Sequence, residues 1–147
     1  MNTEHHKPAP TPCLCNALRQ ASRAVSRFYD EELRGVGLRT TQYSLLSMLA
    51  RTGEVRQGDL GGFIHLEETT LTRNIRPLVV AGWVSVRSGD DRREKLVTIT
   101  AAGTAKLVEA RSAWERAQAR MQALLPEEAR QSLMAILPEV VRLTAGG

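Results

Sequence analysis

The sequence contains no apolar segment that could cross a membrane and no recognisable export signal. A helix needs roughly 20 apolar residues to span a bilayer, and no run in the chain approaches that length. Residues 1–12 carry three prolines and lack the apolar core of a signal peptide. We therefore expect a cytoplasmic protein without membrane contact. Its two cysteines are reduced in that compartment, so a permanent structural disulfide is not expected.

The motifs of common enzyme classes are also absent. No glycine-rich phosphate loop follows a predicted strand, and the three histidines stand in the N-terminal segment or at a helix end, without a paired nucleophile. We therefore expect that the protein is not an enzyme and requires no cofactor.

What remains is the composition of an ordinary soluble protein. A chain of 147 residues with 42% hydrophobic and 24% charged residues is long enough for one domain with its own core. The net charge is +4 and the isoelectric point about 9.6, which favours polyanionic partners only mildly. The placement of the arginines therefore matters more than their number.

The N-terminal part of the chain predicts an arm followed by a helix. Residues 1–12 are predicted to form a mobile arm, and residues 13–147 one domain. Apolar residues then recur at helical spacing, which predicts a first helix over about residues 13–35 with Thr11 as its N-cap. Two closely spaced glycines are typical of its C-terminal end.

Two further helices are predicted after this one. The second follows residue 39, with Thr40 or Thr41 as its N-cap. Residues 57–66 predict the next helix, although each of its three glycines costs about 1 kcal/mol relative to alanine in a helix interior. This helix must therefore be short and held by tertiary contacts, or its glycines allow a neighbour to approach closely.

The clearest signal is a helix followed at once by a β-hairpin. The helix covers residues 67–81 and ends at Gly82, and Pro77 inside it predicts a bend or a loosened last turn. Residues 83–86 and 96–100 predict two strands around a charged loop. The predicted inward-facing residues of the helix are Leu71, Ile75, Leu78 and Val79. This order is typical of a winged helix-turn-helix, here over about residues 40–100.

The C-terminal part predicts two helices with uncovered apolar surface. Thr100 caps a long helix over about residues 101–124, and Pro126 begins a final helix. The apolar side of the final helix consists of Leu133, Ile136, Leu137, Val140 and Val141. A monomer cannot easily cover this surface, so we expect the helices at about 13–35 and 101–145 to pair with a second copy. The resulting homodimer has the two-fold symmetry of a palindromic DNA site.

Three segments resemble the MarR family of bacterial transcription regulators, and the likeness extends over about residues 14–143. They read GLRTTQYSLL, TTLTRNIRPLVVAGWV and DDRREKLVTITAAG, and begin at residues 37, 69 and 90. The resemblance implies a mainly α-helical fold with a β-hairpin wing and a helical dimerisation region. It also implies a homodimeric repressor that places its recognition helices in successive major grooves of a palindromic operator.

The resemblance assigns the DNA contacts to the recognition helix and the wing. In the helix, the side chains are of types that reach base edges and phosphates, with arginine suited to guanine or phosphate and asparagine to adenine. In the wing, the carboxylate of Asp91 is expected to hold the guanidinium of Arg93 and aim it into the minor groove. The candidate residues are Thr69, Thr70, Thr72, Arg73, Asn74, Arg76, Arg87, Asp91, Arg92, Arg93 and Lys95.

The cysteines Cys13 and Cys15 offer one way of releasing the DNA. They stand at the start of the first helix, whose N-terminus favours a thiolate, and Arg19 follows about one turn later. Oxidants, electrophiles or a soft metal ion could act on them, with His5 and His6 as further candidate ligands. The alternative is that the cysteines only pack under the helix.

Binding of a small aromatic inducer is the other way of releasing the DNA. Its pocket is expected between the dimerisation helices and the winged region. Members of the family often bind aromatic carboxylates there. Candidate wall residues are Arg19, Arg23, Tyr43, His65 and Trp83. The arginines of the first helix could instead form only an exposed charged stripe.

A winged-helix protein-interaction scaffold without specific DNA binding is the alternative function.

Overall fold

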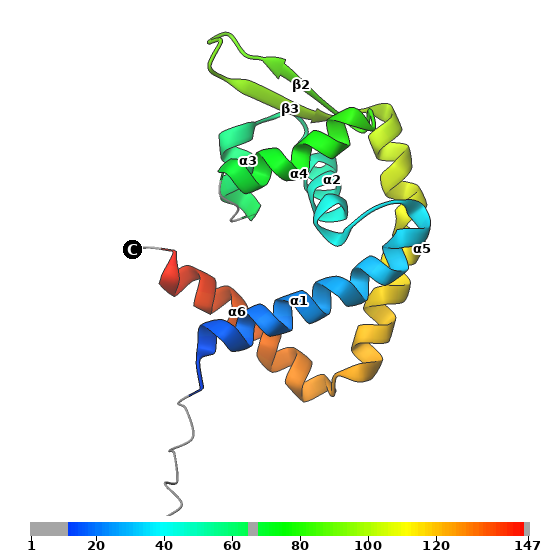
Figure 1. Ribbon diagram of the computed structural model, residues 1–147, viewed down its shortest axis with the longest axis vertical. Coiled ribbons are helices and arrows are strands. Elements are labelled where there is room, and N and C mark those ends of the chain that lie inside the picture. The colour runs from blue at the N-terminus through cyan, green and yellow to red at the C-terminus, as the bar shows by residue number, and fades with distance from the viewer. Residues whose placement is uncertain (1–11, 65–67, 146–147) are drawn as a thin grey trace, which may run out of the picture.

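The computed structural model describes residues 12–64 and 68–145. It is mainly helical with a small antiparallel sheet, which confirms the predicted fold class (Figure 1). The elements are α1 (Leu14–Leu33), the 3-10 turn η1 (Arg34–Val36), α2 (Thr40–Thr52), β1 (Val55–Arg56), α3 (Gln57–Ile64), α4 (Glu68–Val80), β2 (Val84–Ser88), β3 (Lys95–Ile99), α5 (Ala101–Leu124) and α6 (Glu127–Thr144).

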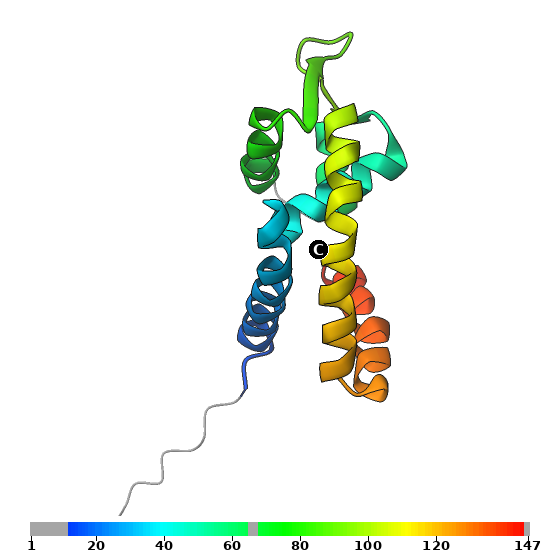
Figure 2. The same ribbon diagram turned by 90° about the vertical axis from the view of Figure 1, so that its right-hand side faces the viewer.

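The molecule has a winged head and a helical base. Helices α2, α3 and α4 gather with the sheet at one end, where β2 and β3 project as the wing (Figure 1). Helix α5 runs from the head to the base, where α1 and α6 lie (Figures 1 and 2). Within the described part of the chain, no helix is both long and apolar enough to cross a bilayer.

The start of α1 differs slightly from the prediction. Cys13 occupies the N-cap position, with extended backbone and its carbonyl accepting from the Ala17 amide at 3.0 Å. The predicted cap, Thr11, lies outside the described residues. At the other end, Gly37 adopts a left-handed conformation with a φ of 75°, which only glycine adopts without strain. The prediction that closely spaced glycines end this helical segment was therefore correct.

The N-terminus of α2 is capped by other residues than predicted. Arg39, not Thr40 or Thr41, is its N-cap residue. The carboxylate of Asp30 on α1 accepts a hydrogen bond from the Thr40 amide at 2.7 Å. The side chain of Gln42 accepts from the Arg39 amide at 3.0 Å. No threonine cap is needed, because Gln42 and Asp30 accept hydrogen bonds from the backbone amides of Arg39 and Thr40.

Helix α4 forms much as predicted and continues through Pro77 to Val80. It ends in a Schellman motif: the Trp83 amide donates to the Leu78 carbonyl at 2.9 Å, and the Gly82 amide to that of Val79 at 3.0 Å. Gly82 has the positive φ of 79° that this motif needs. The inward assignment of Val79 was wrong, because its side chain is 40% exposed.

The sheet has one strand more than the predicted hairpin. Strands β2 and β3 pair antiparallel with Val86 opposite Val97, and β1 pairs with the other edge of β3. Because β1 has only two residues, it leaves no alternating pattern for sequence analysis to detect. It nevertheless ties the start of α3 to the base of the wing.

The junction between the wing and α5 is tightly packed. As predicted, the Thr100 hydroxyl caps α5 and accepts from the Gly103 amide at 3.0 Å. A β-carbon added to Gly103 would lie 2.0 Å from the backbone oxygen of Trp83. This glycine therefore permits the close approach between α5 and the chain that enters β2.

The core joins the head to α5, while α6 leaves much apolar surface open. The fully buried side chains include Leu33, Leu45, Leu46, Leu49, Leu60, Leu71, Leu78 and Val97. In contrast, Leu133, Met134, Ile136, Leu137, Val141 and Leu143 are exposed at 38–70%. The predicted apolar side of α6 is thus uncovered in a single chain.

Candidate nucleic-acid interface

Helix α4 has one buried face and one exposed polar face. Leu71, Ile75 and Leu78 are at most 4% exposed and anchor the helix to the core. On the opposite face, Thr69, Arg73 and Arg76 are exposed and border a shallow hollow together with Thr72, Pro77 and Val80. The packing of the apolar face therefore fixes which side chains α4 presents outward.

The remaining predicted residues of α4 lie at the sides of this polar face. Thr70 and Asn74 are partly buried. The Thr72 hydroxyl accepts a hydrogen bond from the Gln57 side-chain amide at 3.2 Å, which links the exposed side of α4 to the beginning of α3. Thr69, Thr72, Arg73 and Arg76 are therefore the predicted residues of α4 that are exposed.

The wing turn is organised by backbone contacts, not by the ion pair that the sequence suggested. The Asp91 carboxylate accepts from the backbone amide of Arg93 at 3.0 Å. The Glu94 amide donates to the Asp91 carbonyl at 2.8 Å, and the Gly89 amide to the Glu94 carbonyl at 2.9 Å. Within the described part of the chain, no ion pair joins Asp91 to the Arg93 guanidinium. Aspartate readily binds backbone amides two residues on, which explains the difference.

The exposed cations of the wing tip remain available for a polyanion. Arg92, Arg93 and Lys95 are exposed, and Asp91 holds the turn from which Arg93 projects. The acidic residue of the predicted pair therefore orients the backbone beneath Arg93 and leaves its guanidinium facing solvent.

Arg87 lies near the loop end of β2 and is held by a carboxylate. Its guanidinium donates to both oxygens of Glu54, at 2.6 and 2.9 Å, and the Thr98 hydroxyl donates to the same carboxylate at 3.1 Å. The hydrogen bond from Arg87 is the main reason that the pKa of Glu54 is lowered. The DNA contact predicted for Arg87 stays a prediction, and it requires the guanidinium to share or leave Glu54.

A hollow of about 360 Å³ lies between the first turn of α3, α4 and the wing residues Arg93, Glu94 and Lys95. The cations around it are Arg56, Arg93 and Lys95, and Arg56 pairs with Glu94 at 3.3 Å. Arg56 and Gln57 could not be singled out from the sequence, because their place depends on β1. Asp59 and Glu94 also line the hollow, so three cations face two carboxylates beside the N-terminus of α3.

The candidate effector residues lie in different surroundings. Cys13 and Cys15 are both exposed at the start of α1, so they do not pack beneath the helix within this subunit. Arg19 is an exposed residue of α1, whereas the partly buried ring of Tyr43 stacks on Trp114 with ring centroids 5.7 Å apart. His65 lies outside the described residues, as do His5 and His6.

One described groove bears on the ligand prediction, and the grouping of side chains bears on the metal prediction. A groove of about 390 Å³ runs between α1, α5 and α6, with Val25, Tyr29, Met121, Leu133 and Leu137 among its lining residues. It lies in the helical base, not beside Tyr43. Across the described ranges, no cluster of three or more histidine, cysteine or acidic side chains is arranged to hold a metal ion.

Comparisons with known proteins agree with this geometry. The sequence profile of the MarR family matches residues 38–95. YwoH, an uncharacterized HTH-type transcriptional regulator of Bacillus subtilis, is 36% identical over 87 residues, which make up 59% of this chain and 64% of YwoH. The chain therefore spans less than two thirds of the length of that relative.

Solved structures extend the likeness over most of the chain. The M. tuberculosis regulator MosR in complex with DNA is 31% identical, with a TM-score of 0.77 over 90% of this chain and 99% of MosR. A cysteine-to-serine mutant of MarR from E. coli, solved with operator DNA, has a TM-score of 0.77 over 87% of this chain and 93% of its own. At 20% identity, it shows a shared fold alone. The relatives are transcriptional regulators, not enzymes, and such regulators generally need no cofactor.

Proposed function

Because this chain belongs to the MarR family of DNA-binding transcription regulators, we propose that it is a homodimeric repressor of a palindromic operator. The observation that carries the proposal is the two-sided α4, with leucine and isoleucine in the core and Thr69, Arg73 and Arg76 outward. Such a helix can enter a major groove without disturbing its own packing. Recognition therefore rests on a rigid element.

The wing and the hollow beside it complete the proposed half-site contact. Arg93 reaches the minor groove next to the major groove that α4 occupies, since a narrow minor groove attracts arginine. The hollow bordered by Arg56 and Lys95 receives the phosphate between the two grooves. The helix supplies base contacts, and the wing and hollow supply contacts that set the register.

Dimerisation is proposed to use the apolar side of α6 together with α1 and α5. Leu133, Leu137 and Val141 follow one another at intervals of four residues and are each about 40% exposed. Burying an apolar side chain of this kind contributes roughly 1–3 kcal/mol, so a row of them from two chains supports a stable interface. The pair of subunits then presents two α4 helices to one duplex.

Release from DNA is proposed to follow either cysteine modification or the binding of a small-molecule inducer. The exposure of Cys13 and Cys15 at the start of α1 favours the first route, because a reagent can reach both sulfurs. The groove between α1, α5 and α6 favours the second. In both cases the trigger lies on helices proposed to form the dimer, so it can change the spacing of the two α4 helices.

The test is fluorescence anisotropy of the protein on a DNA fragment from upstream of its own gene. We expect binding that weakens steeply with salt and exceeds binding to a scrambled fragment, with Arg73→Ala reducing that preference. Titrations after mild peroxide, and again after reductant, separate the two routes of release. Equal affinity for both fragments would remove the proposed specificity, and absence of salt-sensitive binding would favour the interaction scaffold.

A further inference from the structure

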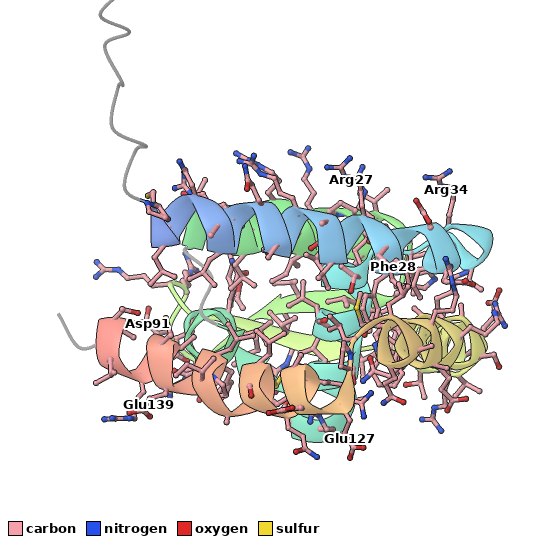
Figure 3. The ribbon with its side chains drawn as sticks, turned by 90° about the horizontal axis from the view of Figure 1, so that it is seen from below. Arg27, Phe28, Arg34, Asp91, Glu127 and Glu139 are labelled. Carbon is pink, nitrogen blue, oxygen red and sulfur yellow. The ribbon has the colours of Figure 1, made fainter. Side chains whose placement is uncertain are left out.

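Helix α1 has an apolar face and an opposite face rich in arginine. Arg19, Arg23 and Arg27 are spaced by four residues, so they lie on one side of the helix, and all three are exposed. Val25 and Tyr29 line the groove towards α5 and α6. Figure 3 shows Arg27 and Arg34 on the side of α1 that faces away from those two helices. We call Arg19, Arg23 and Arg27 the α1 arginine row.

This row is not neutralised within the subunit. The first 14 residues of α1, from Leu14 to Arg27, contain no acidic residue. Among the residues that the structure describes, no carboxylate forms an ion pair with the row. Of the carboxylates that follow on α1, Asp30 accepts from the Thr40 amide, and Glu32 pairs with Arg120 and Arg116 of α5. Glu31 lines the same hollow as Arg27, one turn further along α1, without an ion pair to it.

The row lies on the same side of the molecule as the recognition helix. Helices α1 and α4 both lie on the side that faces the viewer in Figure 1 and the left in Figure 2. From the wing downward, the order on this side is the wing, α4 and then α1 (Figure 1). Glu127 and Glu139 of α6 project from the opposite side (Figure 3). The α1 arginine row therefore lies on the side that carries α4 and away from these two carboxylates.

We propose that the α1 arginine row is a third DNA-contacting surface, which binds the sugar-phosphate backbone of the operator between its two half-sites. The inference rests on the proposed function. In a dimer joined through the helical base, the wings are outermost and the two α1 helices lie nearest the centre of the site. An arginine row without partners there neutralises phosphates that neither α4 nor the wing reaches.

This surface adds affinity and does not add base recognition. Each phosphate contact makes binding more salt-dependent, whereas sequence is read by contacts to base edges. Because the row lies on α1, which also begins with Cys13 and Cys15, the same helix carries both a DNA contact and the exposed thiols.

The experiment compares the full-length protein with the double variant Arg23→Gln and Arg27→Gln. A charge-matched control carries Arg111→Gln and Arg142→Gln, which remove the same charge from α5 and α6. Affinity for the upstream fragment and for a scrambled duplex is measured by anisotropy over a series of salt concentrations. Hydroxyl-radical footprinting reports the protected backbone, and sedimentation reports the dimer.

We expect the α1 variant to bind both duplexes about tenfold more weakly or worse, with the salt exponent reduced by roughly one for each phosphate that is no longer neutralised. Its footprint loses protection at the centre and keeps it at both half-sites, while the control matches the unsubstituted protein. Unchanged affinity, or central protection that persists, overturns the inference. Dissociation of the dimer would overturn it as well, because the row would then bind the partner subunit's carboxylates.

The unsubstituted protein distinguishes this failure from that of the proposed function. If it binds the upstream fragment and the α1 variant binds equally well, only the α1 surface is rejected. If it binds neither duplex, the proposed function and this inference fail together.

Discussion

At the scale of single residues, Asp91 positions the backbone of Arg93 but forms no ion pair with its guanidinium. Asp91 holds the wing turn through the backbone amide of Arg93, which leaves the guanidinium exposed. We expect Arg93→Ala to weaken DNA binding by roughly 1–2 kcal/mol, since a minor-groove arginine is removed. The free energy of unfolding should change by less than about 0.5 kcal/mol, as for other surface substitutions.

Anisotropy and denaturant unfolding measure these two effects separately. Arg92→Ala is the matched control, because it removes the same charge from the adjacent position. Equal losses of affinity for the two variants would reduce Arg93 to a general electrostatic role. Unchanged affinity for Arg93→Ala would remove the wing from the proposed contact.

The sequence predicted residue types better than residue partners. Arg73 and Arg76 could be placed on the outer face of α4 because Leu71, Ile75 and Leu78 define the inner face by their spacing. The role of Asp91 was not predictable in the same way, because a short carboxylate can bind either a guanidinium or a nearby amide. Pattern alone does not decide between them.

At the scale of elements, Gly103 fixes the distance between α5 and the chain entering the wing. We expect Gly103→Ala to lower the free energy of unfolding by about 1–3 kcal/mol, since its β-carbon would collide with the Trp83 carbonyl. Gly62→Ala in α3 is the control, because no atom lies within 4 Å of its added β-carbon. It should be neutral or stabilising by up to about 1 kcal/mol. Chemical unfolding of both variants measures these changes. An unchanged free energy of unfolding for Gly103→Ala would contradict the close contact.

The contact between α1 and α5 predicts a defined pH dependence. Hydrogen bonds from Arg120 and Arg116 hold the pKa of Glu32 below its ordinary value of 4.5. A carboxylate whose pKa is lowered by folding stabilises the folded state above the unfolded pKa, and this contribution is lost as pH falls. The stability difference between the unsubstituted protein and Glu32→Gln should therefore be present at pH 7 and shrink below about pH 4.5. A difference that stays constant from pH 7 to pH 3 would show that the ion pairs contribute nothing to it.

Element predictions succeeded where the signal was local. Thr100, the cap of α5, is three residues before the amide it binds. Gly82 sits at the end of α4 because the Schellman motif requires a positive φ there. The cap of α2 and the strand β1 were missed because they depend on Asp30 and on β3, which are distant in sequence.

At the scale of the whole molecule, the open apolar side of α6 predicts a dimer that can be broken by charge. Leu137→Asp places a carboxylate in the row that also contains Leu133 and Val141. Burying an unpaired charge at an interface is costly, so we expect the dimer to dissociate in sedimentation experiments. DNA binding should weaken with it, because two half-sites are then no longer read together. Ser132→Asp adds the same charge outside this row and should leave the dimer intact.

The family and the winged fold could be predicted from the sequence because α4 and the wing are adjacent in the chain. The dimer interface, the operator and the effector could not, since each depends on a second molecule. The exposed apolar residues of α6 show only that a surface is uncovered. Its proposed partner, a second copy, follows from symmetry and from the palindromes such dimers read.

The most direct test of the central claim is the number of chains bound to one operator. Sedimentation velocity of a fluorescent duplex, titrated with protein, gives the mass of the complex on a full palindrome and on a duplex containing a single half-site. We predict two chains on the palindrome and affinity that is weaker by several kcal/mol on the half-site. One chain per palindrome, with equal affinity for both duplexes, would contradict the account.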